Sequence, residues 1–319
     1  MWELTTLPAG HKAIGLKWVF KVKKDPAGQV IKHKARLVAK GYAQHQGVDF
    51  DEVFAPVARM ETVRLLLALA AHCGWQVHHM DVKSVFLNGD LKEEVYVHQP
   101  PGYIISSEEH KVLRLRKALN RLHQAPRAWY AKLDASLTSL GFERSPLEHA
   151  VFRRSTGKKT LLVDVYVDDL IITGTDANDI AAFKQQIHSL FAMSDLGLLS
   201  YYLGVKVKQE AGAITIFGMV SRYMQAPTAS HWAAVRQILR YIRGTTGYGC
   251  RYKESSGGKP KLVGFSDSDL AGDVDDRKST TGVAFFLDSS IITWTSHKQA
   301  VVALSSCEAE YIAACNAAY

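Results

Sequence analysis

Short runs in which apolar and polar residues alternate are frequent along the chain, and longer stretches with apolar residues every three or four positions lie between them. The first pattern is typical of strands that bury one face, and the second is typical of helices that bury one side. Strands are therefore predicted for residues 17–23, 30–38, 76–81, 161–167, 170–173, 203–209, 213–217, 262–266, 282–287 and 291–295.

Helices are predicted where an apolar stripe follows a capping residue or a proline. Such stripes are core positions far more often than binding surfaces, so we interpret them as buried faces. Together with the strands they indicate an α/β chain of the α+β kind. The first predicted helix covers residues 61–72, and the second begins at Pro126 and ends at Gly141. The third follows a cap at Asp176, the fourth runs from Ser230 to Gly244, and the fifth begins at Ser305.

Two adjacent predicted strands enclose the sequence Tyr166-Val167-Asp168-Asp169. The short spacing predicts a tight hairpin with carboxylates at its tip. Strand alternation places Asp168 on the same face as Tyr166 and Asp164. Exposed carboxylates on a rigid turn suit a polymerase that holds two magnesium ions. The same residues also suit a simple polar turn, and the motif by itself does not separate the two interpretations.

The strand at residues 76–81 supplies another carboxylate, because it ends on Asp81. Two-metal nucleotidyl transfer needs at least one acid from a neighbouring strand. Phe86 follows five residues later and is the next large aromatic residue. The alternative interpretation is that Asp81 caps the following turn.

Bulk properties narrow the choice of partners only slightly. The 319 residues carry a net charge of +8, which favours a polyanionic partner. None of the four cysteines forms a CxxC pair, which indicates a reducing compartment, and the histidines near Cys73 fit no common zinc pattern. The longest strongly apolar run, residues 65–71, is too short to span a bilayer, and no targeting signal is evident at the N-terminus.

The predicted hairpin at residues 17–23 and 30–38 is strongly basic. One interpretation is a flap that contacts phosphates, and the other is a solvated surface hairpin. Charge alone does not distinguish them. The cations in question include Lys23, Lys24, Lys32, Lys34 and Arg36.

Taken in order, several motifs resemble the reverse transcriptase of Ty1/copia-type retrotransposons. The resemblance runs from Trp2 to about Phe217, and it favours the polymerase interpretation of the hairpin. The motifs that carry it are Trp18-Val19-Phe20-Lys21, Lys34-Ala35-Arg36-Leu37-Val38, Phe54-Ala55-Pro56-Val57, residues 80–89, Gln124-Ala125-Pro126-Arg127-Ala128-Trp129-Tyr130, residues 166–169 and Asp195-Leu196-Gly197.

The resemblance implies roles for individual residues. Asp81 and Asp168 match aspartates that hold the two Mg²⁺ ions, for which Mn²⁺ is an alternative, and Asp169 matches a supporting aspartate. Phe86 matches the residue that excludes a ribose 2′-hydroxyl, although plain core packing is its alternative role. The remaining matches are Gln124 in the nucleotide pocket, Lys23, Lys24 and Arg36 on the triphosphate, and Tyr202, Leu203 and Gly204 at the primer end.

The same resemblance implies a fold and partners. The expected fold is a fingers and palm unit with an antiparallel palm sheet and two helices, followed by a partial ribonuclease H-like mixed sheet. The implied partners are an RNA template, a DNA primer and deoxynucleoside triphosphates, with no membrane. The expected location is inside the cell, in cytoplasmic virus-like particles or in the nucleus. Protein partners and oligomeric state are not predicted.

Residues beyond Val220 resemble the connection segment and then ribonuclease H, where Asp267 and Glu308 match two catalytic acids. Several dozen residues that the family has near positions 217–219, including the thumb, have no counterpart, and the match to ribonuclease H stops at Tyr319. The expected domains are 1–217 (fingers and palm), 218–258 (connection remnant and linker) and 259–319 (truncated ribonuclease H-like domain). The predicted function is RNA-directed DNA polymerase with an inactive ribonuclease H. The alternative is a catalytically inactive, internally deleted remnant that at most binds nucleic acid.

Overall fold

The computed structural model describes residues 1–24, 28–203, 205–217, 243–245, 247–255, 258–273 and 276–318. The predicted helix at 230–244 and the connection-like segment fall almost wholly outside these ranges, as does Gly204. Among the described residues, no helix combines the length and apolar character needed to cross a membrane.

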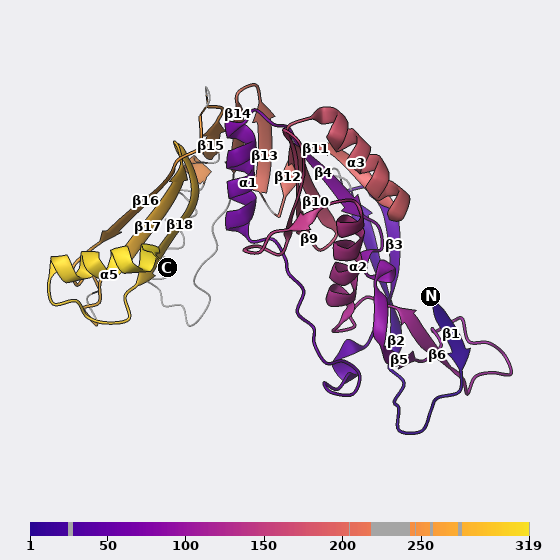
Figure 1. Cartoon of the computed structure of the whole chain (residues 1–319). Helices are drawn as coiled ribbons and strands as arrows, with labels where there is room; N and C mark the ends of the chain where they lie inside the picture. The colour runs from indigo at the N-terminus through magenta and orange to yellow at the C-terminus, as the bar shows by residue number, and fades with distance from the viewer. Residues whose placement is uncertain are drawn as a thin grey trace.

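A six-stranded sheet with the order β11-β4-β10-β9-β8-β7 forms the centre of the molecule (Figure 1). Every pairing in it is antiparallel, as expected for the palm. The predicted hairpin forms its middle. The strands are β4 (Val77–Val82), β7 (Glu143–Arg144), β8 (Val151–Thr156), β9 (Lys159–Tyr166), β10 (Asp169–Gly174) and β11 (Met193–Leu198).

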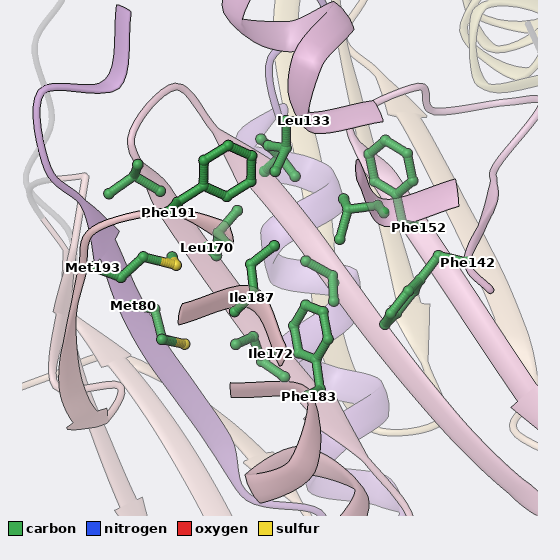
Figure 2. Packing of buried hydrophobic residues seen from close by; sticks show 14 of the residues in the cluster. Met80, Leu133, Phe142, Phe152, Leu170, Ile172, Phe183, Ile187, Phe191 and Met193 are labelled. Carbon is green, nitrogen blue, oxygen red and sulfur yellow. The ribbon is translucent and has the colours of Figure 1, made fainter. Parts of the chain in front are cut away.

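Helices α2 (Ala125–Ser139) and α3 (Ala177–Leu190) cover one face of this sheet. Alternation along β10 sends Leu170 and Ile172 into the core on that side. Figure 2 shows this core, where the two residues meet side chains from both helices and from β4 and β8. Asp176 caps α3 as predicted, accepting hydrogen bonds from the amides of Asn178 and Asp179.

Helix α1 (Met60–His72) covers the opposite face, so the sheet is enclosed by three helices where two were expected. Ile171, which points away from Leu170 and Ile172, belongs to the core beneath α1. The same core includes residues from a four-stranded antiparallel sheet. That sheet has the order β12 (Tyr201–Tyr202), β13 (Val205–Glu210), β14 (Ala213–Phe217) and β15 (Cys250–Lys253).

Strand β15 was not predicted from the sequence. It lies within the segment assigned to connection and linker, yet it pairs with β14 in antiparallel register, with Ile214 opposite Tyr252. Tyr252 is fully buried in the core under α1. This strand therefore makes residues 250–253 part of the folded unit.

The residues expected to form the fingers include two separate sheets and two short 3₁₀ helices. The basic hairpin forms as predicted, from β2 (Leu16–Lys24) and β3 (Val30–Ala39). The remaining elements are η1 (Gly41–Ala43), η2 (Val85–Asn88) and the three-stranded sheet β1-β6-β5, made of β1 (Trp2–Thr5), β5 (Asp90–Val97) and β6 (Val112–Lys117).

The C-terminal residues form three strands and a helix, close to the predicted boundaries. Their pairings are all antiparallel, so the expected mixed sheet is wrong for the described residues. Consecutive strands joined by a tight turn, such as the one at Asp288, can only pair antiparallel. The elements are β16 (Leu262–Ser268), β17 (Thr280–Leu287), β18 (Ser290–Lys298) and α5 (Ser306–Ala318).

This C-terminal sheet packs on helix α1 (Figure 1). Leu287 and Ile292 join the buried core beneath that helix. Arg64 of α1 stacks over the Trp294 ring with its guanidinium carbon 4.2 Å from the ring centroid, and His72 Nδ1 lies 2.8 Å from an Asp288 carboxylate oxygen. Apolar burial and polar contacts thus join this sheet to α1 and the core beneath it.

Candidate active site at the tip of the central hairpin

The β9–β10 hairpin closes through a two-residue turn made of Val167 and Asp168. Tyr166 pairs with Asp169 across this turn, and Asp169 also pairs with Asp81 on the neighbouring strand β4. Directly paired residues share a face, so Asp81, Asp169 and Tyr166 form one row. Alternation does not continue through the turn. It is therefore Asp169, and not Asp168 as predicted, that shares the strand face of Tyr166 and Asp164.

Val167 adopts a left-handed backbone conformation with φ +55°. A β-branched residue takes this conformation only where its surroundings enforce it. Two hydrogen bonds do so here. The indole Nε1 of Trp129 donates to the Val167 carbonyl at 2.7 Å, and the Val82 amide donates to the Asp168 carbonyl at 2.8 Å. Helix α2 and strand β4 therefore hold the tip that carries the acids.

The carboxylates at the tip influence one another. The pKa of Asp168 is raised, first because partial burial disfavours its charged form and further because Asp169 and Asp81 carry like charge. Arg36 and a hydrogen bond from a backbone amide act in the opposite direction. The Lys83 ammonium lies 3.6 Å from an Asp81 oxygen. The site thus gathers negative charge that a cation would stabilise.

The basic hairpin faces these acids. Cross-strand pairing places Lys21 opposite Lys34 and Lys23 opposite Lys32, and Arg36 lies farther along the same face of β3. The pKa of Lys34 is lowered by desolvation and by its cationic neighbours, whereas the charge of Asp81 raises it. Lys24 is the last residue of β2. Lys34 was not among the predicted nucleotide-binding residues, although it occupies the centre of this cationic face.

The donor set fits a hard cation only in part. Within the described ranges, no three His, Cys, Asp or Glu side chains lie close enough to form a complete metal cage. Magnesium is usually bound through one or two carboxylates plus substrate phosphates, and not by an all-protein cage. Asp81 and Asp168 satisfy that smaller requirement, and the like charges of Asp169 and Asp81 add to the effect of burial in raising the pKa of Asp168.

Phe86 and Gln124, the two residues expected in the nucleotide pocket, differ in exposure. Phe86, in η2, is partly buried and packs against two of the hydrophobic cores. Gln124 is buried, and its amide is engaged: its carbonyl oxygen accepts from Gln44 and its nitrogen donates to the Asp49 carbonyl. In this arrangement Gln124 holds the fingers loop to α2, and its side chain is not open to a nucleotide.

Of the predicted primer-binding residues, Tyr202 lies on β12 and Leu203 follows it, while Gly204 lies outside the described residues. Tyr202 is 3% exposed, its ring belongs to the core under α1, and its hydroxyl is buried without a partner within the described ranges. Burial and the nearby charge of Asp164 raise its pKa. Leu203 has φ +47° and packs against the same core. The neighbouring Tyr201 is the exposed aromatic residue of this strand.

Two further residues beneath the tip were not among the predicted site residues. His79 Nε2 lies 2.7 Å from Asp169 Oδ1. Asp164 is fully buried, and within the described ranges neither of its carboxylate oxygens has a hydrogen-bond partner of good geometry. Desolvation, with a smaller effect of Glu148, raises the pKa of Asp164 to about 7. The only sequence signal for Asp164 is an acid at an inward position of a strand, and His79 carries none.

The two ribonuclease H-like acids are not brought into a metal-binding cluster. Asp267 is exposed on β16. Glu308 lies in the first turn of α5, where its carboxylate accepts from the Leu304 amide at 2.7 Å while its own amide donates to Ser305. This resembles a capping box, except that the glutamate accepts from the amide one residue before Ser305 and not from that of Ser305 itself. Neither acid belongs to a group of three metal-binding side chains in the described part of the chain.

Comparison with known proteins gives a consistent result. Residues 1–226 match the family model described as reverse transcriptase (RNA-dependent DNA polymerase). The chain is 35% identical to the retrovirus-related Pol polyprotein from transposon TNT 1-94 of Nicotiana tabacum, over 98% of this chain and 29% of that protein. It is 32% identical to the retrovirus-related Pol polyprotein from transposon RE1 of Arabidopsis thaliana, over 99% of this chain and 26% of that protein. It is 26% identical to the putative transposon Ty5-1 protein YCL074W of Saccharomyces cerevisiae, over 74% of this chain and 98% of that protein.

Two features of these matches concern the extent of the chain. It spans less than a third of the length of the TNT 1-94 and RE1 polyproteins. The two alignments extend over 388 and 381 residues, which exceeds the 319 residues of the chain. These relatives therefore contain residues within the matched region that have no counterpart here.

Proposed function

The chain belongs to the reverse transcriptase (RNA-dependent DNA polymerase) family, of the Ty1/copia type, and on that premise we propose that it carries the DNA-synthesising site of a retrotransposon polyprotein. The reaction would be nucleotidyl transfer from a deoxynucleoside triphosphate to a DNA primer paired with an RNA template. It would take place inside the cell, in the cytoplasm or nucleus, where such a template is found.

The observation that carries this proposal is the pairing of Asp81 with Asp169 beside Asp168. The two strands come from distant parts of the sequence, yet they place three acids at one sheet edge. Asp168 interacts electrostatically with both of the other two. Nucleotidyl transfer needs this convergence, because charge develops on the phosphate and on the leaving pyrophosphate.

Asp81 and Asp168 are the residues that would hold Mg²⁺ or Mn²⁺, with Asp169 supporting them. When bound, the two ions would lower the pKa of the primer hydroxyl and neutralise charge on the triphosphate. The protein contributes the fixed position of the acids, through Trp129 and Val82. A rigid tip avoids the cost of reorganising the site during the reaction.

The cationic face of the β2–β3 hairpin would bind the triphosphate. Both Lys34 and Arg36 interact with the site's acids. The charge of Asp81 raises the pKa of Lys34, and Arg36 lowers the pKa of Asp168. Lys23, near the end of β2 and opposite Lys32, would extend this contact toward the phosphates. Cations placed around a phosphate both raise affinity and stabilise charge that develops in the transition state. Phe86 would lie beside the sugar and exclude a 2′-hydroxyl.

The alternative is an inactive remnant that binds nucleic acid without extending it. The alignments longer than the chain favour this alternative, because relatives contain residues that are lacking here. We assign the missing segment to the region after Phe217, where the family has its thumb. Without a thumb, fewer cations follow the duplex, so binding should be weaker and extension distributive. The ribonuclease H-like part would be inactive in either case.

Primer extension on an RNA template, with Mg²⁺ and deoxynucleotides, tests the proposal. The parent chain should add nucleotides, and Asp168→Asn and Asp81→Asn should each reduce the rate by at least ~10²-fold, because a metal ligand is lost while the shape is kept. Asp51→Asn, at an exposed acid in the fingers loop, is the control and should extend at the parent rate. Absence of extension by the parent, with retained binding of template–primer, would support the inactive remnant.

A further inference from the structure

His79 approaches one of the site's acids more closely than any lysine or arginine does in the described part of the chain. Its Nε2 atom lies 2.7 Å from Asp169 Oδ1. We propose that His79 is a positioning residue, which holds the Asp169 carboxylate in a single orientation and so strengthens divalent-cation binding at the tip. This inference rests on the proposed function, because it concerns the same site.

The strand register explains why these two residues meet. Asp81 pairs with Asp169, and His79 pairs with Ile171, so all four lie on one face of the β4–β10 pair. His79 and Asp169 are then diagonal neighbours, a separation that a long side chain can bridge. The contact joins residues 90 positions apart. It exists only because β4 and β10 pair in this register.

The direction of the hydrogen bond follows from its chemistry. An ionised carboxylate has no proton to donate, so the proton of this bond is on His79 Nε2. The His79 side chain is 11% exposed, and the edge of its ring meets Tyr202 at a centroid distance of 5.7 Å. Packing therefore restricts the imidazole to the position from which it donates to Asp169.

Orientation matters at this position because Asp169 has like-charged neighbours. Asp168 and Asp81 both lie near enough to interact with one another, and Asp169 raises the pKa of Asp168. A carboxylate without a donor would rotate away from such neighbours. The His79 bond occupies Oδ1, while Oδ2 has no hydrogen bond or ion pair among the described residues. Donors that fix the orientation of metal-binding carboxylates change metal affinity by roughly 10–100-fold when they are removed.

The adjacent His78 offers a matched control. It lies on the same strand but on the other face, where its Nδ1 is 3.0 Å from Lys184 Nζ. Lys184 in turn bonds to Asp195, which is not part of the tip. A change at His78 disturbs the packing of β4 in a similar way without affecting Asp169.

The experiment measures Mn²⁺ binding to the full chain by electron paramagnetic resonance, since free Mn²⁺ gives a strong signal that weakens on binding. The variants are His79→Leu, His79→Gln and His78→Leu, each checked for folding by its thermal melt. His79→Leu should weaken Mn²⁺ binding by about tenfold or more. His79→Gln should restore most of the affinity, because the glutamine amide reaches the same oxygen with an N–H. His78→Leu should bind as the parent does.

Parent-like Mn²⁺ affinity in His79→Leu would overturn the inference while leaving the proposed function intact, provided that Asp168→Asn abolishes binding. Equal loss in His79→Leu and His79→Gln would also overturn it, because the donor would then not be the reason for the effect. If the parent chain binds no Mn²⁺, both the inference and the metal site of the proposed function are wrong.

Discussion

Trp129 and Val167 are joined by a hydrogen bond of 2.7 Å between the indole Nε1 and the backbone carbonyl. Trp129 lies on α2 and is 2% exposed, and Val167 is the strained residue of the turn that carries Asp168. The bond thus connects the hydrophobic core directly to the candidate active site. It also explains how a β-branched residue is kept at a positive φ.

Trp129→Phe should loosen this tip. The phenyl ring keeps most of the packing, but the Val167 carbonyl loses the donor of a partly buried hydrogen bond, so the free energy of unfolding should fall by about 1–2 kcal/mol. Primer extension should fall as well, because Asp168 is no longer held. Tyr130→Phe is the control, since it removes a donor from the same helix to the His149 carbonyl, away from the tip. Equal effects of both variants on extension would contradict the role given to Trp129.

Asp164 should make the stability of the fold depend on pH. Its pKa is raised from 3.8 to about 7 in the folded state, so the folded chain binds this proton more tightly than the unfolded chain does. The free energy of unfolding should therefore fall as the pH rises from 4 to 7, by roughly 4 kcal/mol from this group, and its contribution should be constant above that range.

Asp164→Asn should remove this part of the pH dependence, because the amide does not ionise. Denaturant unfolding at a series of pH values measures it, and the difference between variant and parent is the informative quantity. The variant should gain stability relative to the parent as the pH rises through 4–7. Asp51→Asn, which changes an exposed acid, should not. A pH-independent difference for Asp164→Asn would show that Asp164 is ionised in the folded protein.

Phe86→Ala should increase ribonucleotide incorporation relative to deoxynucleotide incorporation, because it opens room for a 2′-hydroxyl. The partial burial of Phe86 between two cores means that the variant should also lose stability. The measured quantity is the incorporation ratio under conditions where the variant is folded. A lower melting temperature with an unchanged ratio would indicate that Phe86 serves only packing.

Leu287→Ala should destabilise the palm as well as the C-terminal sheet. Leu287 is 8% exposed and belongs to the core under α1, so its truncation should cost about 2–4 kcal/mol. Hydrogen exchange in α1 reports on the palm side of that core. Leu304→Ala, at a position 89% exposed in the same part of the chain, should have little effect. Unchanged exchange in α1 would show that the sheet unfolds independently.

Cleavage of the RNA strand of an RNA–DNA hybrid should not be detectable with the full chain and Mg²⁺. Asp267 is exposed, and the Glu308 carboxylate is engaged in capping its own helix. Two-metal hydrolysis requires several acids around the ions, and the described residues offer no such group here. Hybrid cleavage that disappears in Asp267→Asn would refute this prediction.

Local patterns were sufficient to predict helices α1, α2, α3 and α5 and the strands of several hairpins, but they did not predict β1, β5, β6, β7, β8, β11, β12 or β15. Alternation gave the boundaries of the central hairpin, and the Asp176 cap and the apolar stripe after it predicted α3. The motif around Asp168 also indicated where the acids would be. These features depend on neighbours within a few residues, so the sequence alone determines them.

Only the tertiary structure decided which distant residues meet. The pairing of β4 with β10 brings Asp81 and His79 to Asp169, and a two-residue turn gives Asp169 the face that alternation had assigned to Asp168. Burial of the Gln124 amide and the packing of Leu287 beneath α1 are likewise long-range results. Alternation specifies that a strand has two faces, but the partner strand, its register and the side that is buried depend on the packing of the whole chain.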